Sequence, residues 1–146
     1  MAYWRLFYHI TFATKNREPM ISTDIEREFH GYLVGKSQAL GAIVYAVDGI
    51  QDHVHVAASV PPKIAIADFV GQVKGAASFH INHLPTRPPT PFDWQRGYGV
   101  VSFGQKDLDR VIAYVRNQKE HHRCGDVIAG LERDDELDDA PQVGKS

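Results

Sequence analysis

Two strand-like segments in the middle of the chain constrain its fold more than any other feature. Residues 42–47 read AIVYAV and residues 52–60 read DHVHVAASV, and both are rich in the β-branched residues that favour strands. A turn signal, Asp48-Gly49, separates them, and two prolines follow the second segment, where they end it because proline cannot donate a hydrogen bond to a neighbouring strand. The pattern predicts a β-hairpin.

Helix and strand patterns alternate on both sides of this hairpin. Strand patterns cover residues 3–14 and 97–103, and helical patterns cover residues 24–39, 64–84 and 107–123. Thr23 and Glu26 form a capping-box pattern at the start of the first helix. The order βαββαβα indicates an α+β fold: a ferredoxin-like antiparallel sheet with helices on one face, followed by a C-terminal helix.

Charge divides the chain into two parts. Residues 1–123 carry 14 Lys and Arg against 11 Asp and Glu, whereas residues 124–146 carry 2 against 7. The last part also has few large apolar side chains, which predicts one domain over 1–123 and an acidic, flexible tail over 124–146. The slightly basic charge of the domain allows nucleic-acid binding without requiring it.

The expected compartment is the cytoplasm. The longest apolar stretch, residues 39–47, is far too short to span a bilayer, so no membrane partner is expected. The first residues, MAYWRLFYHI, lack the pattern of a secretion signal. Cys124 is the only cysteine of the sequence, which excludes a disulfide within the chain and fits a reducing environment.

His53 and His55 lie two residues apart in the second strand of the hairpin. Residues at i and i+2 of a strand point to the same face, whereas Val54 and Val56 point to the other. Two neutral imidazoles that converge on one point make half of a metal site. The alternative is that both histidines are ordinary members of a strand, because this spacing also occurs by chance.

Tyr114 and Gln118 lie one turn apart at the border of the apolar stripe of the last helix. Tyr114 alone is typical of an aromatic residue at the margin of a core, and Gln118 alone of an exposed polar residue. Beside the histidine pair they favour another reading. A divalent cation on two histidines and a glutamine carbonyl can polarise a phosphodiester, which lowers the barrier to attack by a tyrosine hydroxyl.

Four segments in order carry a resemblance to a known family: YHITFATKNREPM, DHVHV, WQRGYGVVSF and YVRNQKEHHR. From about Tyr3 to Arg123 the chain resembles the single-tyrosine HUH transposases of the smallest insertion sequences and their REP-associated relatives. The resemblance implies cleavage of single-stranded DNA, with Tyr114 becoming linked to a 5′ phosphate. It also implies that His53, His55 and Gln118 bind a divalent metal, Mg²⁺ or Mn²⁺.

The resemblance further implies partners. Members of the family recognise DNA hairpins near the ends of their elements and form homodimers in which the tyrosine helix of one subunit completes the site of the other. Five basic residues are the candidates for phosphate contacts: Lys74, Arg87, Arg96, Arg116 and Lys119. Trp94 and Tyr98 either stack on bases or pack in the core. After His122 the chain departs from the family pattern, which leaves the contribution of its C-terminus open.

Three other functions compete with this interpretation. The main alternative is a non-catalytic nucleic-acid-binding module of ferredoxin-like fold, which leaves the spacing of the histidines and of Tyr114 and Gln118 to coincidence. A histidine-based phosphoesterase would need a second HxT or HxS motif, which the sequence lacks. A closed structural zinc site is disfavoured because the lone Cys124 belongs to no CxxC pair.

Overall fold

Four strands form a single antiparallel sheet in the computed structural model, which describes residues 2–134 and 140–141. The strands are β1 (Phe7–Ala13), β2 (Ile43–Ile50), β3 (His53–Ser59) and β4 (Gly99–Phe103). Their order across the sheet is β2-β3-β1-β4, so the hairpin of β2 and β3 occupies one side and β1 lies beside β3. This order and the alternation of helices and strands confirm the predicted ferredoxin-like α+β fold.

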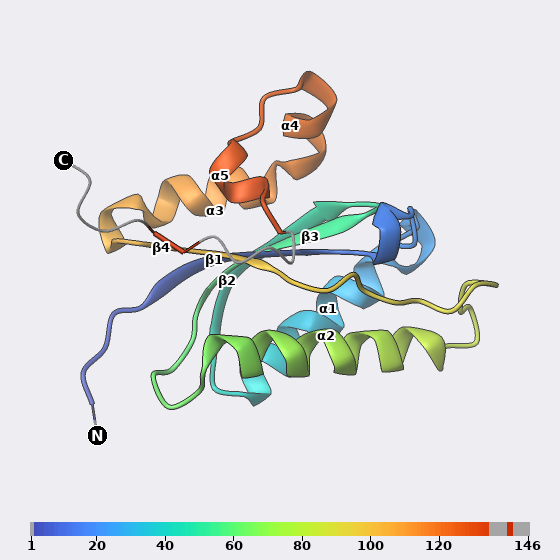
Figure 1. Ribbon diagram of the computed structural model, residues 1–146, viewed down its shortest axis with the longest axis horizontal. Coiled ribbons are helices and arrows are strands. Elements are labelled where there is room, and N and C mark those ends of the chain that lie inside the picture. The colour runs from blue at the N-terminus through green and yellow to red at the C-terminus, as the bar shows by residue number, and fades with distance from the viewer. Residues whose placement is uncertain (1, 135–139, 142–146) are drawn as a thin grey trace.

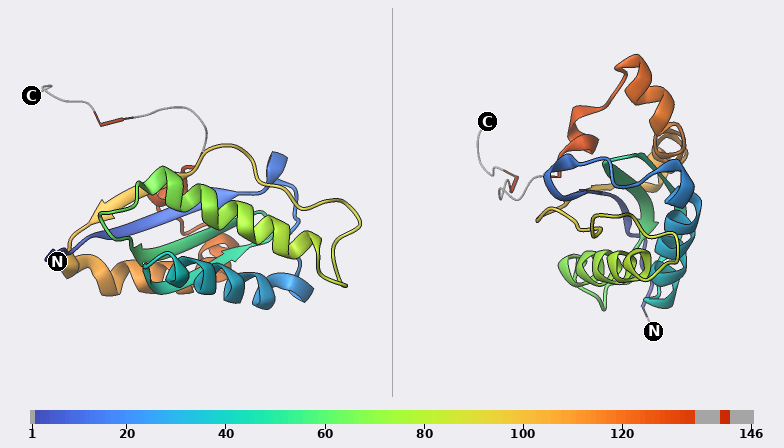
Figure 2. Two further views of the ribbon diagram at one scale, coloured as in Figure 1. Left: turned by 90° about the horizontal axis from the view of Figure 1, so that it is seen from below. Right: turned by 90° about the vertical axis from the view of Figure 1, so that its right-hand side faces the viewer.

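Helices cover both faces of the sheet (Figures 1 and 2). The helices α1 (Thr23–Ala39) and α2 (Ile66–Asn82) pack side by side on one face. Three shorter helices lie on the other: α3 (Leu108–Arg116), α4 (Gln118–Cys124) and α5 (Ala129–Glu132). Single 3-10 turns, η1 (Lys15–Arg17) and η2 (Gln105–Asp107), follow β1 and precede α3. Among the described residues, none of the helices combines the length and apolar character that a membrane span requires.

Alternation along the two central strands separates the core from a polar face. Ile10 and Phe12 of β1, with Val54 and Val56 of β3, point toward α1 and α2 and belong to the main hydrophobic cluster. The alternate residues, His9 and Thr11 of β1 and His53 and His55 of β3, point the other way. The two-residue period of a strand therefore places the histidines on the face that α3, α4 and α5 cover.

The hairpin turns later than predicted. Asp48 and Gly49 belong to β2, and the turn lies at Gln51 and Asp52. The glycine has a packing reason, because a Cβ atom on Gly49 would come within 2.2 Å of the carbonyl oxygen of His53. Gly49 therefore allows a close approach between β2 and β3, and the Asp-Gly pair is not a turn here.

The helix boundaries differ from the prediction in two places. Ser22, and not Thr23, is the N-cap residue of α1, and no side-chain hydrogen bond caps that helix, so the capping-box prediction was wrong. The single last helix is divided at Asn117, whose backbone (φ −109°, ψ 31°) leaves the helical region. This break turns α4 relative to α3 after residue 116.

Residues 125–134 fold back onto the sheet, whereas a solvated tail was expected from residue 124 onward. Gly125 adopts a left-handed conformation (φ 70°) that ends α4, and α5 follows over the polar face. Asp134 is buried and accepts hydrogen bonds from Arg17 at 2.9 and 3.1 Å. Acidic side chains here are held by cationic and polar partners, which composition alone does not reveal. The remaining tail prediction concerns residues 135–139 and 142–146, which lie outside the described residues.

Two of the residues considered for DNA binding support the fold instead. The Nζ atom of Lys74 donates to the carbonyl oxygens of Gln95 and Gly97 at 2.9 and 3.0 Å. Trp94 is buried and packs against Phe12 and other aromatic residues of the core, and its indole nitrogen donates to the Lys74 carbonyl at 2.9 Å. The two side chains together hold the segment that leads into β4.

Replacing Lys74 by methionine should therefore destabilise the protein. The change keeps the aliphatic stem but leaves two carbonyl oxygens without their charged donor, so we expect the free energy of unfolding to fall by about 2 kcal/mol. Urea denaturation measures this change. Lys63→Met is the matched control, because Lys63 is exposed and its replacement should leave the midpoint nearly unchanged. Equal midpoints for both variants would contradict the structural role of Lys74.

Candidate functional site

The histidines of β3 form the floor of the site. His53 and His55 are both buried, with 2% and 0% of their surface exposed, and their rings lie on the face covered by α3, α4 and α5. On β1 the residues paired with them are Ala13 and Thr11, whose side chains are small. The strand geometry thus brings both imidazoles to one place, as their spacing predicted.

Each of these histidines has a partner on its Nδ1 atom. Asp52 places Oδ1 at 2.7 Å from Nδ1 of His53, and His9 places Nε2 at 2.8 Å from Nδ1 of His55. Burial and the neighbouring His55 lower the pKa of His9 to about 3, so His9 is neutral and can accept a hydrogen bond. With a metal ion in place of the hydrogen on Nε2, both contacts would hold imidazoles that carry hydrogen on Nδ1 and turn the lone pair of Nε2 to the centre of the site.

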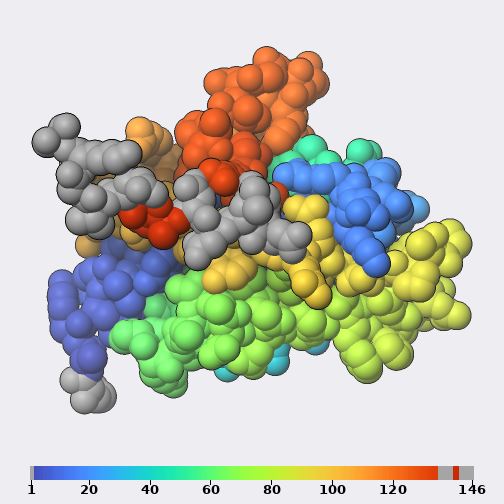
Figure 3. All heavy atoms as spheres, in the orientation of Figure 1, coloured from blue at the N-terminus to red at the C-terminus, as the bar shows by residue number. Residues whose placement is uncertain are grey.

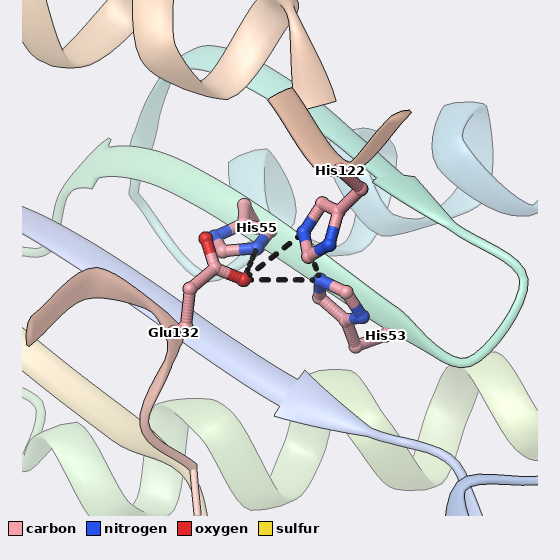
Figure 4. Close-up of side chains that lie close together, drawn as sticks. All are labelled: His53, His55, His122 and Glu132. Carbon is pink, nitrogen blue, oxygen red and sulfur yellow. Dashed lines mark hydrogen bonds and ion pairs between the residues drawn. The ribbon is translucent and has the colours of Figure 1, made fainter. Parts of the chain in front are cut away.

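Two residues of the C-terminal region complete a cluster at that centre (Figure 4). Oε1 of Glu132 lies 3.3 Å from Nε2 of His53, 3.1 Å from Nε2 of His55 and 3.1 Å from Nε2 of His122. The Nε2 atoms of His53 and His122 are 3.2 Å apart. Burial disfavours the charge on Glu132, but the hydrogen bonds from His53 and His55 outweigh it and hold the pKa of Glu132 well below its usual range.

The pKa values of the two β3 histidines move in opposite directions. Burial lowers the pKa of His55, and the hydrogen bond to Glu132 does not fully offset it. Burial acts on His53 in the same sense, but hydrogen bonds to Glu132 and Asp52 outweigh it and raise its pKa. Asp52 beside His53, and repulsion of charge on His55 by the neighbouring His53 and His122, account for the difference between the two pKa values.

Tyr114 lies next to this cluster, on the buried side of α3. Its hydroxyl donates a hydrogen bond to Oε2 of Glu132 and accepts one from the backbone N–H of Ile128 at 3.0 Å. Its ring stacks on His121 with the centroids 4.7 Å apart. Burial and the adjacent carboxylate raise the pKa of Tyr114 to about 12, so the hydroxyl keeps its proton in this arrangement.

Gln118 is the first residue of α4 and is fully buried. Its Nε2 atom donates to the carbonyl oxygen of Tyr114 at 2.9 Å, and its Oε1 atom lies 3.1 Å from Nε2 of His122. The break at Asn117 does not separate Tyr114 from Gln118. The structure therefore brings together all four predicted site residues, Tyr114, His53, His55 and Gln118, and does so within one chain.

The predicted phosphate contacts do not gather at the site. Lys119 binds Glu26 and lies 3.1 Å from Oδ1 of Asp48, so its charge is already neutralised. Burial lowers the pKa of Lys74, which is engaged as described above. The other three candidates have exposed side chains: Arg87, Arg96 and Arg116. These three are the ones that remain accessible to a phosphate.

Sequence reasoning missed His9, His122 and Glu132. A signal existed for His122, which lies one helical turn after Gln118. None existed for His9, because its place beside His55 depends on the pairing of β1 with β3. No such signal existed for Glu132, because its position depends on the chain reversal after Gly125.

The donor set suits a divalent metal ion. The nitrogen atoms of His53, His55 and His122 and a carboxylate oxygen of Glu132 all lie within 4.8 Å of one another. Neutral imidazoles and carboxylates are the side chains that bind such ions, and the partners on Nδ1 of His53 and His55 are those that orient metal-binding histidines. The residues present therefore fit the metal that the histidine pair predicted, although its identity does not follow from them.

Comparison with known proteins gives consistent matches over most of the chain. The family model described as "Transposase IS200 like" matches residues 2–118. Transposases for insertion sequence element IS200 from Salmonella typhimurium and Salmonella typhi are each 25% identical to this chain over 130 residues, covering 86% of it and 85% of their own length.

Two solved structures share the fold. A protein from Deinococcus radiodurans R1 described as a candidate transposase has a TM-score of 0.60 at 23% identity and covers 81% of this chain and 95% of its own. A REP-associated tyrosine transposase bound to a REP hairpin also has a TM-score of 0.60, at 15% identity, with 87% of this chain and 76% of its own covered.

Proposed function

The chain belongs to the family of IS200-like transposases, and from this premise we propose that it cuts and rejoins single-stranded DNA through Tyr114. One observation carries the proposal. A single carboxylate, that of Glu132, touches the Tyr114 hydroxyl with one oxygen and the histidine nitrogens with the other. A group of that size and charge therefore meets nucleophile and metal ligands at once, which is what a scissile phosphate must do.

The proposed reaction is a transesterification. The hydroxyl oxygen of Tyr114 attacks the phosphorus atom and loses its proton as the new bond forms, while the bond from phosphorus to the 3′ oxygen breaks. The leaving 3′ oxygen takes up a proton and becomes a free hydroxyl. The phosphate is then bonded to the Tyr114 oxygen and keeps its ester bond to the 5′ oxygen of the DNA. Because one phosphoester bond replaces another, a 3′ hydroxyl can later attack this linkage and rejoin a strand without ATP.

We propose His53, His55 and Gln118 as the ligands of a divalent ion, Mg²⁺ or Mn²⁺, during this reaction. Such an ion polarises a phosphate and stabilises the charge that develops on its oxygens. The chain itself orients the ligands: Asp52 and His9 hold the two imidazoles, and the Tyr114 carbonyl holds the Gln118 side chain. Gln118 thereby also connects the metal site to the helix that carries the nucleophile.

We propose hairpin-forming single-stranded DNA as the substrate. The solved REP-associated relative is bound to a REP hairpin, which supports a similar partner for this chain. Arg87, Arg96 and Arg116 are the proposed phosphate contacts, because their side chains are exposed. Lys74 and Lys119 would have to leave their present partners before they could contact DNA.

A covalent adduct is the direct test. The protein is incubated with labelled single-stranded oligonucleotides that carry the inverted repeats flanking its gene, in Mg²⁺ or in Mn²⁺, and is then denatured. We expect a labelled protein band that survives denaturation and disappears on protease treatment. DNA binding without any adduct in either metal would instead favour the non-catalytic nucleic-acid-binding module.

The dimer with shared sites stays a prediction. The arrangement within the single chain shows which contact of Tyr114 would have to change for such a dimer to form. Tyr114 here meets the histidines of its own chain, through Glu132. In the dimer implied by the family resemblance, α3 would carry Tyr114 to the partner, with Gly104 and Gln105 before that helix as the hinge.

Mixing two inactive variants tests this exchange. Tyr114→Phe and His55→Ala homodimers are combined and allowed to exchange subunits. A heterodimer with shared sites has one intact site, so adduct formation should recover to about a quarter of the parent level after random pairing. Proven heterodimers without any recovery would show that each chain uses its own tyrosine, as in the present arrangement.

A further inference from the structure

Residues 125–134 are fastened to the polar face of the sheet at three points. Glu132 contacts the histidine cluster, and Asp134 accepts hydrogen bonds from Arg17. Between them, the carbonyl oxygen of Arg133 lies only 1.8 Å from where a Cβ atom on Gly99 would be, so the segment needs a glycine in β4 at that position. In Figure 3 the orange and red atoms of α4 and α5 stand out from the body as one lobe. These contacts of three consecutive residues give the end of the segment a defined position.

Four distances within the cluster are close to those between the ligands of a tetrahedral metal site. Four separations among the Nε2 atoms of His53, His55 and His122 and the Oε1 atom of Glu132 are 3.1, 3.1, 3.2 and 3.3 Å. Ligands at about 2.0–2.1 Å from a central zinc ion lie about 3.3 Å from one another when the coordination is tetrahedral. These four separations are close to those that a bound ion would impose, and all four donor atoms lie within 4.8 Å of one another.

We propose that the resting protein holds a Zn²⁺-like transition-metal ion in a closed site of His53, His55, His122 and Glu132. This inference deepens the proposed function and rests on it, because it concerns the same histidine pair. Three imidazole nitrogens suit Zn²⁺ or Co²⁺, whereas Mg²⁺ prefers oxygen ligands in an octahedron. His122 and Glu132 are thus additional ligands, supplied by the part of the chain that lies beyond the matched residues 2–118.

A closed site has a consequence for DNA. Four protein ligands fill a tetrahedral shell and leave no position for a phosphate oxygen, whereas catalytic sites keep one position open. Glu132 also accepts the hydrogen bond of the Tyr114 hydroxyl with its second carboxylate oxygen. Release of the carboxylate would free the metal and the nucleophile together, so entry of DNA requires displacement of Glu132.

Metal binding without DNA tests the ligand set. The full chain, free of any histidine tag, is titrated with Zn²⁺ by equilibrium dialysis, and its Co²⁺ form is followed by visible absorption. The parent should show the intense bands of tetrahedral Co²⁺. Glu132→Gln and Glu132→Ala should weaken these bands and raise the Kd for Zn²⁺ about tenfold or more, since even residues that only orient ligands have effects of that size.

Asp126→Asn is the matched control. It removes one negative charge from the same segment, and Asp126 is exposed, with His121 as its partner at 3.6 Å. Its Zn²⁺ affinity and Co²⁺ spectrum should equal those of the parent. If the two Glu132 variants also equal the parent in both measurements, Glu132 is not a ligand and the inference fails.

DNA binding separates this inference from the proposed function. With Zn²⁺ present, single-stranded DNA should bind more tightly to Glu132→Gln than to the parent, and equal or weaker binding would overturn the displacement of Glu132. If the Glu132 variants keep the metal affinity of the parent and the parent forms a Tyr114-dependent adduct, the closed site is overturned and the proposal of strand cleavage is retained. Lowered metal affinity without an adduct from any variant in Mn²⁺ would support the closed site and overturn strand cleavage.

Discussion

Replacing Tyr114 with phenylalanine should leave a folded protein that binds hairpin DNA and forms no covalent adduct. The variant lacks only the attacking oxygen, so the ring keeps its stacking on His121. Loss of a nucleophile typically costs about a thousandfold or more in rate, because the remaining groups cannot replace it. The yield of labelled protein–DNA adduct measures the effect, and retention of a hairpin on a native gel measures binding.

The variant has a structural cost that must be separated from the chemical one. Without the hydroxyl, Glu132 loses a donor and the backbone N–H of Ile128 loses its acceptor, which should lower the free energy of unfolding by about 1–3 kcal/mol. Tyr45→Phe is the control, since it removes a hydroxyl whose partner is Oγ of Ser59 at 2.8 Å, away from the site. That control should form adduct like the parent. An undiminished adduct in Tyr114→Phe would exclude Tyr114 as the nucleophile.

His55→Ala should abolish cleavage through loss of metal binding. His55 is completely buried between His9 and Glu132, so its removal takes one nitrogen from the centre of the site and leaves His9 without its partner. We expect no detectable adduct and a Kd for Mn²⁺ raised about tenfold or more, as measured by titration calorimetry. His53→Ala should act in the same way, because its Nε2 atom faces the same point.

His80→Ala provides the comparison for these variants. It removes a histidine from the opposite side of the sheet, where the ring stacks on Tyr32 with the centroids 4.1 Å apart. Its adduct yield and Mn²⁺ affinity should match the parent. Should His53→Ala and His55→Ala also bind Mn²⁺ as the parent does, both histidines would be structural and the metal would bind elsewhere.

The order of helices and strands followed from periodicity in the sequence. Alternation in DHVHV requires both histidines on one face and both valines on the other, whatever the rest of the chain does. The apolar spacing of residues 24–39 and 64–84 likewise requires two amphipathic helices to cover the valine face, and the structure has α1 and α2 there. Local patterns of this kind were sufficient for the ferredoxin-like fold.

Contacts between distant residues required the tertiary structure. In the sequence, Lys74 and Lys119 were candidates for phosphate contacts on the same grounds as the exposed arginines, because the sequence does not show which groups surround a charged side chain. The fold places carbonyl oxygens around Lys74 and two carboxylates beside Lys119. The prediction of a turn at Asp48-Gly49 was wrong for a related reason. The glycine is needed because the His53 carbonyl oxygen approaches it closely, and this contact joins the two strands of the hairpin.

The sequence alone determined the fold class, the histidine pair and the spacing of Tyr114 and Gln118, because each depends on a helix or strand period. Only the tertiary structure decided that His9 supports His55, and that His122 and Glu132 join the cluster. Glu132 belongs to a segment whose composition favours exposure to solvent. It is held at the centre because burial of its charge is offset by three imidazoles and a hydroxyl, which come from β3, α3 and α4. Such compensation exists only once these elements have packed together.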